Sequence, residues 1–331
     1  MTVRGRPAKP NDIRKCVGIV AAHPVLRRRY AEILSDLPKV MLSLLSREAF
    51  SCMVVAEEGA TSQILGGAVS TFVQESFFRE IKMPPSFWGT PEIVRRELKG
   101  QSVILSNSEL LRANADNGLN LFIWHLGIPD DQQRPEVVTA LLSSFVNAYG
   151  GYNLKEFIGQ ADSWRHFAAM RQSGGCIIWP ESGEYADHFE SIEVDVTQTP
   201  VNVGITRELA QGPAIGSWVS TLFNYSPPRL GLSRAQQRMI SAALDGHIDE
   251  ELSKQLSISL FTVKKEWLEV GRRAARNLPA AFADFLHEDQ PKWRGKQKRH
   301  RLLAYLHEHP EELRPTLRQR KNNVAGKQII C

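Results

Sequence analysis

The amino-acid sequence predicts an α+β protein, with a mixed β-sheet flanked by helices in its N-terminal part and only helices in its C-terminal part. Strand-like and helical patterns alternate as far as about residue 196, whereas every segment after the Pro227-Pro228 pair has helical periodicity. A length of 331 residues also exceeds that of one ordinary domain. We therefore expect an α/β domain at residues 1–196, a linker at 197–228 and an all-α domain at 229–331.

Two helices and a hairpin are expected at the start of the chain. Asn11 or Asp12 can cap a first helix that ends near Ala22, and the spacing of apolar residues predicts a second helix over 27–45. Runs of β-prone residues then predict two strands, at 51–57 and 63–74.

The rest of this domain follows an irregular stretch that contains several prolines. A helix is predicted at 135–149, because Pro135 suits the first helical turn and the Gly150-Gly151 pair suits its end. Further strands are predicted at 119–128, 155–159, 176–179 and 189–196, with another helix at 162–171.

Composition predicts a cytoplasmic globular protein with no membrane partner. Hydrophobic residues make up 42% of the chain and charged residues 23%, which is ordinary for globular domains. No apolar run reaches the roughly 18 to 20 residues of a membrane span, and the N-terminus lacks the apolar core of a secretion signal. Cys16, Cys52, Cys176 and Cys331 lack the close spacing of a metal or redox site, so we expect no disulfide, metal or other cofactor.

Positive charge is concentrated at the C-terminal end. The formal net charge is +5, yet residues 226–331 contain 20 Lys and Arg against 12 Asp and Glu, a balance of +8. The first 225 residues are therefore at −3. The C-terminal domain also contains a basic run at 292–301 that includes Trp293. This asymmetry indicates a polyanionic partner for the C-terminal domain, and nucleic acid is the natural one.

The C-terminal domain contains three short helices with one abrupt turn. Helices are predicted at 233–244 and 249–256, and a third helix is capped by Ser259 directly after the tight turn at Ser257-Ile258. This arrangement is typical of a helix-turn-helix unit.

The third helix has two different faces. Its apolar residues Val263, Trp267, Val270 and Ala274 share one narrow side, which we expect to be buried. The opposite side is predicted to meet DNA, with Lys264 and Lys265 near bases or phosphates and Arg272, Arg273 and Arg276 on phosphates. The expected DNA-binding residues are Ser259, Phe261, Thr262, Lys264, Lys265, Leu268, Arg272, Arg273 and Arg276. The alternative is a small helical bundle with a solvated charged face.

Residues 232–267 resemble the LuxR (GerE-type) family of helix-turn-helix regulators. The residues that match the family pattern in register are Leu232, Ser233, Gly246, Glu251, Leu252, Leu256, Ile258, Ser259, Thr262, Val263 and Lys264. The resemblance implies DNA contact by Lys264 and Lys265 and a phosphate or capping role for Thr262. It also shows departures, since Ser257 replaces the usual turn glycine and Glu266 replaces a histidine, and the acidic Glu266 is expected to narrow what can be bound.

The element order of residues 1–196 resembles the GNAT acetyltransferase fold. That family binds pyrophosphate on a glycine-rich turn at the start of a helix, where backbone N–H groups reach phosphate oxygens. The corresponding stretch here, 130–137, has no glycine, and Pro135 lacks an N–H. The family often has a tyrosine that acts as general acid for the leaving thiolate. Its position here falls near Met170, whose side chain cannot donate a proton. We therefore expect a non-catalytic domain.

Together these features predict a sequence-specific, DNA-binding transcriptional regulator that acts as a homodimer on double-stranded DNA. Its GNAT-like domain would sense a small-molecule effector, in a cleft beside Trp124 and near Trp164, or would serve only for dimerisation. The alternative is an active N-acyltransferase that uses acetyl-CoA and is targeted to DNA by its C-terminal domain.

Overall fold

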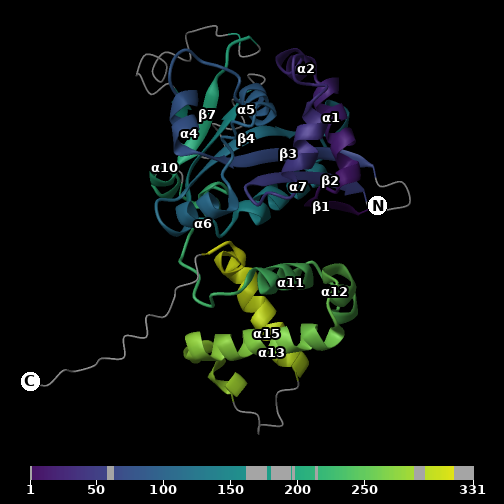
Figure 1. Ribbon diagram of the computed structural model, residues 1–331, viewed down its shortest axis with the longest axis vertical. Coiled ribbons are helices and arrows are strands. Elements are labelled where there is room, and N and C mark those ends of the chain that lie inside the picture. Colours follow the sequence, from purple (N-terminus) through teal and green to yellow (C-terminus); the bar gives the residue numbers. More distant parts are fainter. Residues whose placement is uncertain are drawn as a thin grey trace, which may run out of the picture. The chain divides into compact units, whose positions relative to one another are not determined.

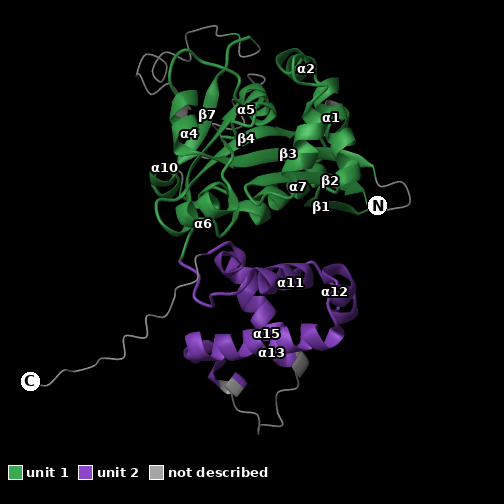
Figure 2. Ribbon diagram, viewed as in Figure 1, with its two compact units in different colours: residues 1–226 green, residues 227–331 purple. Residues whose placement is uncertain are grey.

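The computed structural model describes residues 2–57, 63–161, 177–179, 195, 198–212, 215–286 and 295–316. The chain divides into two compact units, residues 1–226 and 227–331 (Figure 2). The boundary lies at the Pro227-Pro228 pair, where the sequence changes to an all-helical pattern.

Unit 1 is built on a seven-stranded mixed sheet with strand order β1-β2-β3-β4-β5-β7-β6 (Figure 1). The strands are β1 (Val3–Pro7), β2 (Phe50–Glu57), β3 (Ile64–Val73), β4 (Leu119–Gly127), β5 (Leu154–Gln160), β6 (Ile177–Trp179) and β7 (Asn202–Thr206). All neighbours are antiparallel except β4 and β5, which are parallel. A parallel pair needs a crossover connection, and helix α7 (Pro135–Tyr149) provides it.

The central strand β4 is irregular near its end. Val69 of β3 pairs with His125, but the next residue, Ser70, pairs with Ile123, so Trp124 is an extra residue in β4. Such a β-bulge bends the strand and redirects its side chains. The pairing of β4 with β5 ends at Ile123, so β4 continues beyond its parallel neighbour.

Helices surround this sheet and bury one continuous core. They are α1 (Ile13–Ala22), α2 (Pro24–Arg29), α3 (Leu37–Leu44), α4 (Glu75–Ile81), α5 (Gly89–Leu98), α6 (Asn107–Ala115), α7 and α10 (Arg207–Gln211), with short 3-10 turns η1 (Pro10–Asp12), η2 (Asp130–Gln132) and η3 (Ser220–Phe223). Helix α7 packs on β1, β2 and β3, where Val137, Leu141 and Phe145 are buried. This arrangement confirms the predicted α+β class and the predicted helix at 135–149.

Several expectations for unit 1 are wrong. The single helix expected over 27–45 is two helices, α2 and α3, because the chain forms turns over 30–36 and Pro38, which has no N–H to donate to a preceding helical turn, occupies the first turn of α3. The stretch after residue 74 is largely helical, and β1 at the sheet edge was not expected. The helix predicted at 162–171 lies outside the described residues, as does most of the strand predicted at 189–196.

The expectation of a linker at 197–228 is also wrong. Residues 202–223 form β7, α10 and η3, and these elements belong to unit 1. Strand β7 pairs with both β5 and β6, and Val203, Ile205 and Phe223 are buried. Unit 1 therefore continues as far as Ser226.

Unit 2 contains only helices in its described residues. They are α11 (Arg234–Leu244), α12 (Asp249–Leu256), α13 (Leu260–Asn277), α14 (Pro279–Phe282) and α15 (Gly295–Glu308), with 3-10 turns η4 (Ala283–Leu286) and η5 (Pro310–Leu313). The first three lie within one residue of their predicted bounds where those were given. Their core includes Met239, Ile240, Leu252, Leu302 and Leu306. None of the helices described in either unit combines the length and apolar character required to cross a membrane.

Candidate nucleic-acid interface

Helix α13 is the longest helix of unit 2 and is held at its start by a compact turn (Figure 1). Ser257 has left-handed backbone angles, φ 53° and ψ 43°. Its N–H donates to the Lys254 carbonyl at 3.3 Å, and the N–H of Ile258 donates to the Ser253 carbonyl at 3.1 Å. These two bonds define a Schellman motif, which ends α12 and turns the chain directly into α13.

The first turn of α13 is capped by its own side chains. The hydroxyl oxygen of Ser259 accepts a hydrogen bond from the N–H of Thr262 at 3.0 Å, and the two hydroxyl groups are 2.8 Å apart. Ser259 is thus the capping residue, and Thr262 is the residue whose backbone N–H it satisfies. Ser259 and Thr262 therefore help to fix where the helix begins.

One side of α13 is anchored in the core. Val263, Val270 and Ala274 are fully buried, as predicted. Trp267 is only half-buried, and its indole N–H donates to Asp249 Oδ1 at 3.2 Å. The Arg299 guanidinium lies over the indole ring, 4.4 Å from its centre, and also forms an ion pair with Asp249. These contacts could not be predicted from local sequence patterns, because the residues that make them are separated by up to 50 positions.

The opposite side of α13 is an exposed stripe with basic and apolar side chains. It consists of Phe261, Lys264, Lys265, Leu268, Arg272 and Arg276, which we call the basic stripe, and all six are exposed. Their spacing of three and four residues places them along one face. Within the described part of the chain, Lys264, Lys265 and Arg276 make neither an ion pair nor a side-chain hydrogen bond.

Two charged residues of α13 lie off the basic stripe. Arg273, which we expected to contact phosphate, is half-buried: its Nη1 donates to the Gly231 carbonyl at 2.5 Å, and its Nη2 lies 3.5 Å from Glu269. Glu266 accepts a hydrogen bond from the Gln236 amide at 2.9 Å. Arg273 therefore anchors the segment before α11, and the carboxylate of Glu266 is engaged by α11.

The basic run at 292–301 is described only in part. Lys298 lies 5.7 Å from the centre of the Phe285 ring, and Arg299 is paired with Asp249 as above. Arg301 donates to the Ala281 carbonyl. These three cations make contacts inside unit 2, whereas Lys264, Lys265 and Arg276 of the basic stripe make none that involves a charged or polar side chain of the described residues.

Unit 1 offers little to a phosphate group at the start of α7. Arg134 is 2.9 Å from Glu57 and 3.5 Å from Glu136, so its charge is compensated by two carboxylates. Pro135 occupies the first helical turn and has no N–H to donate. Met170, near which the resemblance placed the GNAT family's tyrosine, lies outside the described residues.

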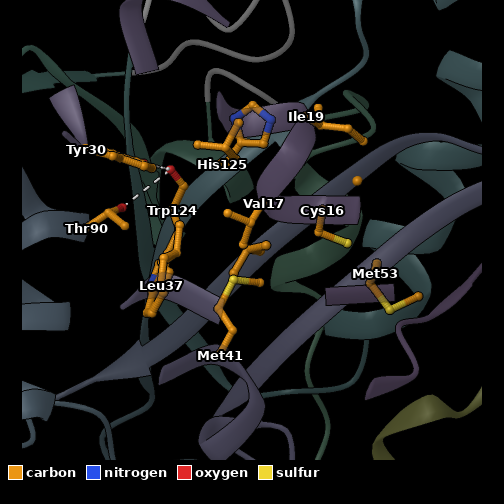
Figure 3. Close-up of a pocket in the computed structure, with 13 residues that line it drawn as sticks. Cys16, Val17, Ile19, Tyr30, Leu37, Met41, Met53, Thr90, Trp124 and His125 are labelled. Atoms are coloured by element: carbon orange, nitrogen blue, oxygen red, sulfur yellow. Dashed lines mark hydrogen bonds between the residues drawn. The ribbon is translucent and has the colours of Figure 1, made fainter. Parts of the chain in front are cut away.

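A small apolar cavity lies beside the bulged residue Trp124. Figure 3 shows Tyr30 and Thr90 pointing at the backbone oxygen of Trp124, to which their hydroxyl groups donate at 2.9 and 3.5 Å. The cavity measures about 20 Å³ and is otherwise lined mainly by apolar and sulfur-containing side chains, including Cys16, Met41 and Met53. About 10–15 Å³ is needed to hold one water molecule, so the cavity is far smaller than a metabolite site in this conformation. Trp164, expected near this cleft, lies outside the described residues.

One of two buried thiols, that of Cys16, lines this cavity. Cys16 and Cys52 are both free of disulfide bonds and buried, Cys16 on α1 and Cys52 on β2. A hydrogen bond between the two groups lowers the pKa of Cys16, and together with burial it raises that of Cys52. Among the residues that the structure describes, no cluster of three or more His, Cys, Asp or Glu side chains could hold a metal ion.

Comparisons with known proteins give only distant similarities. No protein-family model matches the chain, and no curated protein matches it. Among solved structures, it is similar to a Corynebacterium glutamicum protein described as "histone acetyltransferase HPA2 and related acetyltransferase", at 14% identity and a TM-score of 0.34, covering 62% of this chain and 95% of that one. An uncharacterized protein from Bacillus halodurans is similar at 11% identity and a TM-score of 0.35, covering 67% and 91% of the two chains. At these values neither similarity assigns a function to this chain.

Proposed function

We propose that unit 2 binds double-stranded DNA through the basic stripe of α13, and that the protein is a sequence-specific transcriptional regulator. One observation carries this proposal: Lys264, Lys265 and Arg276 share an exposed face and, within the described residues, have no carboxylate partner. A structural role for such cations would leave them paired or packed. A polyanion is the partner that compensates them.

The shape of α13 suits the major groove. With 18 residues it extends for about 27 Å, and Phe261, Lys264 and Lys265 in its first turns are exposed. In a helix-turn-helix protein the N-terminal residues of the recognition helix meet base edges. Lys264 and Lys265 then lie within reach of bases, and Arg272 and Arg276, further along the helix, serve phosphates.

The orientation of the other charged residues is consistent with this use of the helix. Glu266 would repel DNA if it pointed outward, but its carboxylate is bound by Gln236 of α11. Glu266 therefore has no role in limiting which DNA sequences are bound. Arg273 is left out of the interface because its guanidinium contacts the Gly231 carbonyl and Glu269.

Unit 1, in this proposal, senses a small molecule or joins two copies of the chain. A homodimer is expected because a single recognition helix touches too few bases to select a site in a genome. The cavity beside Trp124 would have to widen to admit an effector. An acetyl-CoA-dependent acyltransferase is the alternative function, but the pairing of Arg134 with two carboxylates does not favour it.

Selection of bound duplexes from a random DNA pool by the full-length protein tests this proposal. The expected result is enrichment of one motif, arranged as an inverted repeat if the protein binds as a dimer. Absence of any enriched motif would contradict sequence-specific binding. Release of free thiol from acetyl-CoA on addition of an amine would favour the acyltransferase.

A further inference from the structure

Phe261 is the most exposed large hydrophobic residue in the described part of the chain. Its exposed fraction is 77%, against 51% for Leu268 on the same helix. Burying a phenylalanine side chain typically stabilises a protein by about 1.5–3 kcal/mol, so leaving it in water gives up that gain. Within the described residues, Phe261 makes no contact with another aromatic ring or with a cation. No such contact therefore gives it a role in stabilising unit 2.

The position of Phe261 places it among the cations of the basic stripe. It is the second residue of α13, three residues before Lys264 and four before Lys265, so the three side chains emerge from one face of adjacent turns. A partner that covers Phe261 must therefore also accept two lysine side chains. This charge complementarity favours DNA over an apolar protein surface.

The major groove offers one apolar group that an aromatic side chain can recognise. Base edges there present hydrogen-bond donors and acceptors, and thymine alone adds a 5-methyl group. Phe261 has no hydrogen-bonding atom in its side chain, so it can discriminate bases only by apolar contact. We infer that Phe261 contacts the 5-methyl group of a thymine and makes the recognised sequence dependent on thymine at that position. This inference rests on the proposed function of unit 2.

The test removes the methyl group without changing the hydrogen-bonding edges of the base pair. Duplexes enriched by the full-length protein are prepared with each thymine replaced in turn by uracil, and the Kd of each is measured. The loss of one buried methyl-sized group corresponds to about a fourfold weaker affinity. We expect this penalty at one thymine per half-site for the wild-type protein, and no penalty there for Phe261→Ala.

Ile248→Ala is the matched control, because Ile248 is an apolar residue of unit 2 that is 57% exposed and lies outside α13. This variant should keep the full uracil penalty. If Phe261→Ala binds too weakly, low salt strengthens phosphate contacts enough for measurement, and Phe261→Leu supplies a second apolar side chain that should keep part of the penalty.

Three results would overturn the inference while DNA binding itself still holds. They are an enriched motif without thymine, an equal uracil penalty in wild type and Phe261→Ala, and loss of dimerisation in Phe261→Ala with the penalty unchanged, which would assign Phe261 to a protein interface. Failure of the wild-type protein to enrich any duplex would instead contradict the proposed function.

Discussion

The left-handed turn before α13 gives a direct test of how the candidate interface is positioned. Ser257 is the one non-glycine residue with positive φ in the described part of the chain, at 53°. Its side chain is exposed and makes no hydrogen bond within the described residues. We predict that Ser257→Gly stabilises unit 2, because glycine adopts this conformation without a clash involving Cβ.

The magnitude follows from two opposing effects. An L-residue in the left-handed region costs roughly 1–2 kcal/mol, which the substitution removes. Glycine has more backbone freedom in the unfolded chain, and this costs about 0.5–1 kcal/mol. The net gain in the free energy of unfolding therefore lies between about 0 and 1.5 kcal/mol, with a midpoint of about 0.75 kcal/mol. For a unit of this size the midpoint corresponds to a rise in Tm of about 3–6 °C.

Differential scanning calorimetry of the full-length protein measures this change. Ser257→Ala is the control for loss of the hydroxyl group, and it should leave Tm nearly unchanged because alanine keeps the strained backbone. Ser259→Ala should instead lower stability by about 1 kcal/mol, since it removes the cap on Thr262. A Tm for Ser257→Gly equal to or below that of wild type would refute the conformation assigned to this turn.

Further predictions concern charged residues that the structure assigns to different roles. Arg273→Gln should lower the free energy of unfolding by about 1–3 kcal/mol in a urea titration and leave the Kd for DNA nearly unchanged. Exposed Arg276→Gln should leave the free energy of unfolding nearly unchanged and raise the Kd for DNA. Equal effects of the two substitutions on DNA affinity would contradict the assignment. Glu312→Gln should destabilise unit 2, because the Glu312 carboxylate accepts backbone hydrogen bonds from Arg229 and Leu230 at 2.9 and 2.8 Å. Burial raises the pKa of Glu312, so its protonation favours the folded state. The stability of wild type relative to Glu312→Gln should therefore increase as pH is lowered through this raised pKa towards 4.5, and a pH-independent difference would contradict it.

Elements with clear local signals could be predicted from the sequence. The bounds of α7 match because Pro135 favours a helix start and the glycines at 150–151 favour its end. Helix α11 begins after Ser233, whose hydroxyl oxygen accepts from the Gln236 N–H at 3.2 Å while the Gln236 side chain accepts from the Ser233 N–H at 2.9 Å. Such caps depend on residues only three positions apart.

The remaining features depend on contacts between distant segments. The residues that neighbour Glu266 in the sequence do not indicate that it accepts a hydrogen bond from Gln236, 30 residues earlier. The contact of Arg273 with the Gly231 carbonyl is likewise not indicated by its neighbours. Helical periodicity places both residues within reach of the basic stripe, and only packing against α11 and the segment before it determines their direction. Strand β7 was missed for a similar reason, since its five residues, Asn202–Thr206, are ordered by pairing with β5 and β6.

The use of the basic stripe for DNA is tested most directly by reversing two of its charges. The measurement is the Kd of the full-length protein for an enriched duplex, by fluorescence anisotropy, with wild type, Lys264→Glu/Lys265→Glu and Lys39→Glu/Lys99→Glu compared. Lys39 and Lys99 are exposed residues of unit 1, so the control changes net charge by the same amount. We predict that the stripe variant loses at least about thirtyfold in affinity, with unchanged circular dichroism, whereas the control remains within a few-fold of wild type. Equal losses in both variants, or wild-type affinity in the stripe variant, would contradict DNA recognition by α13.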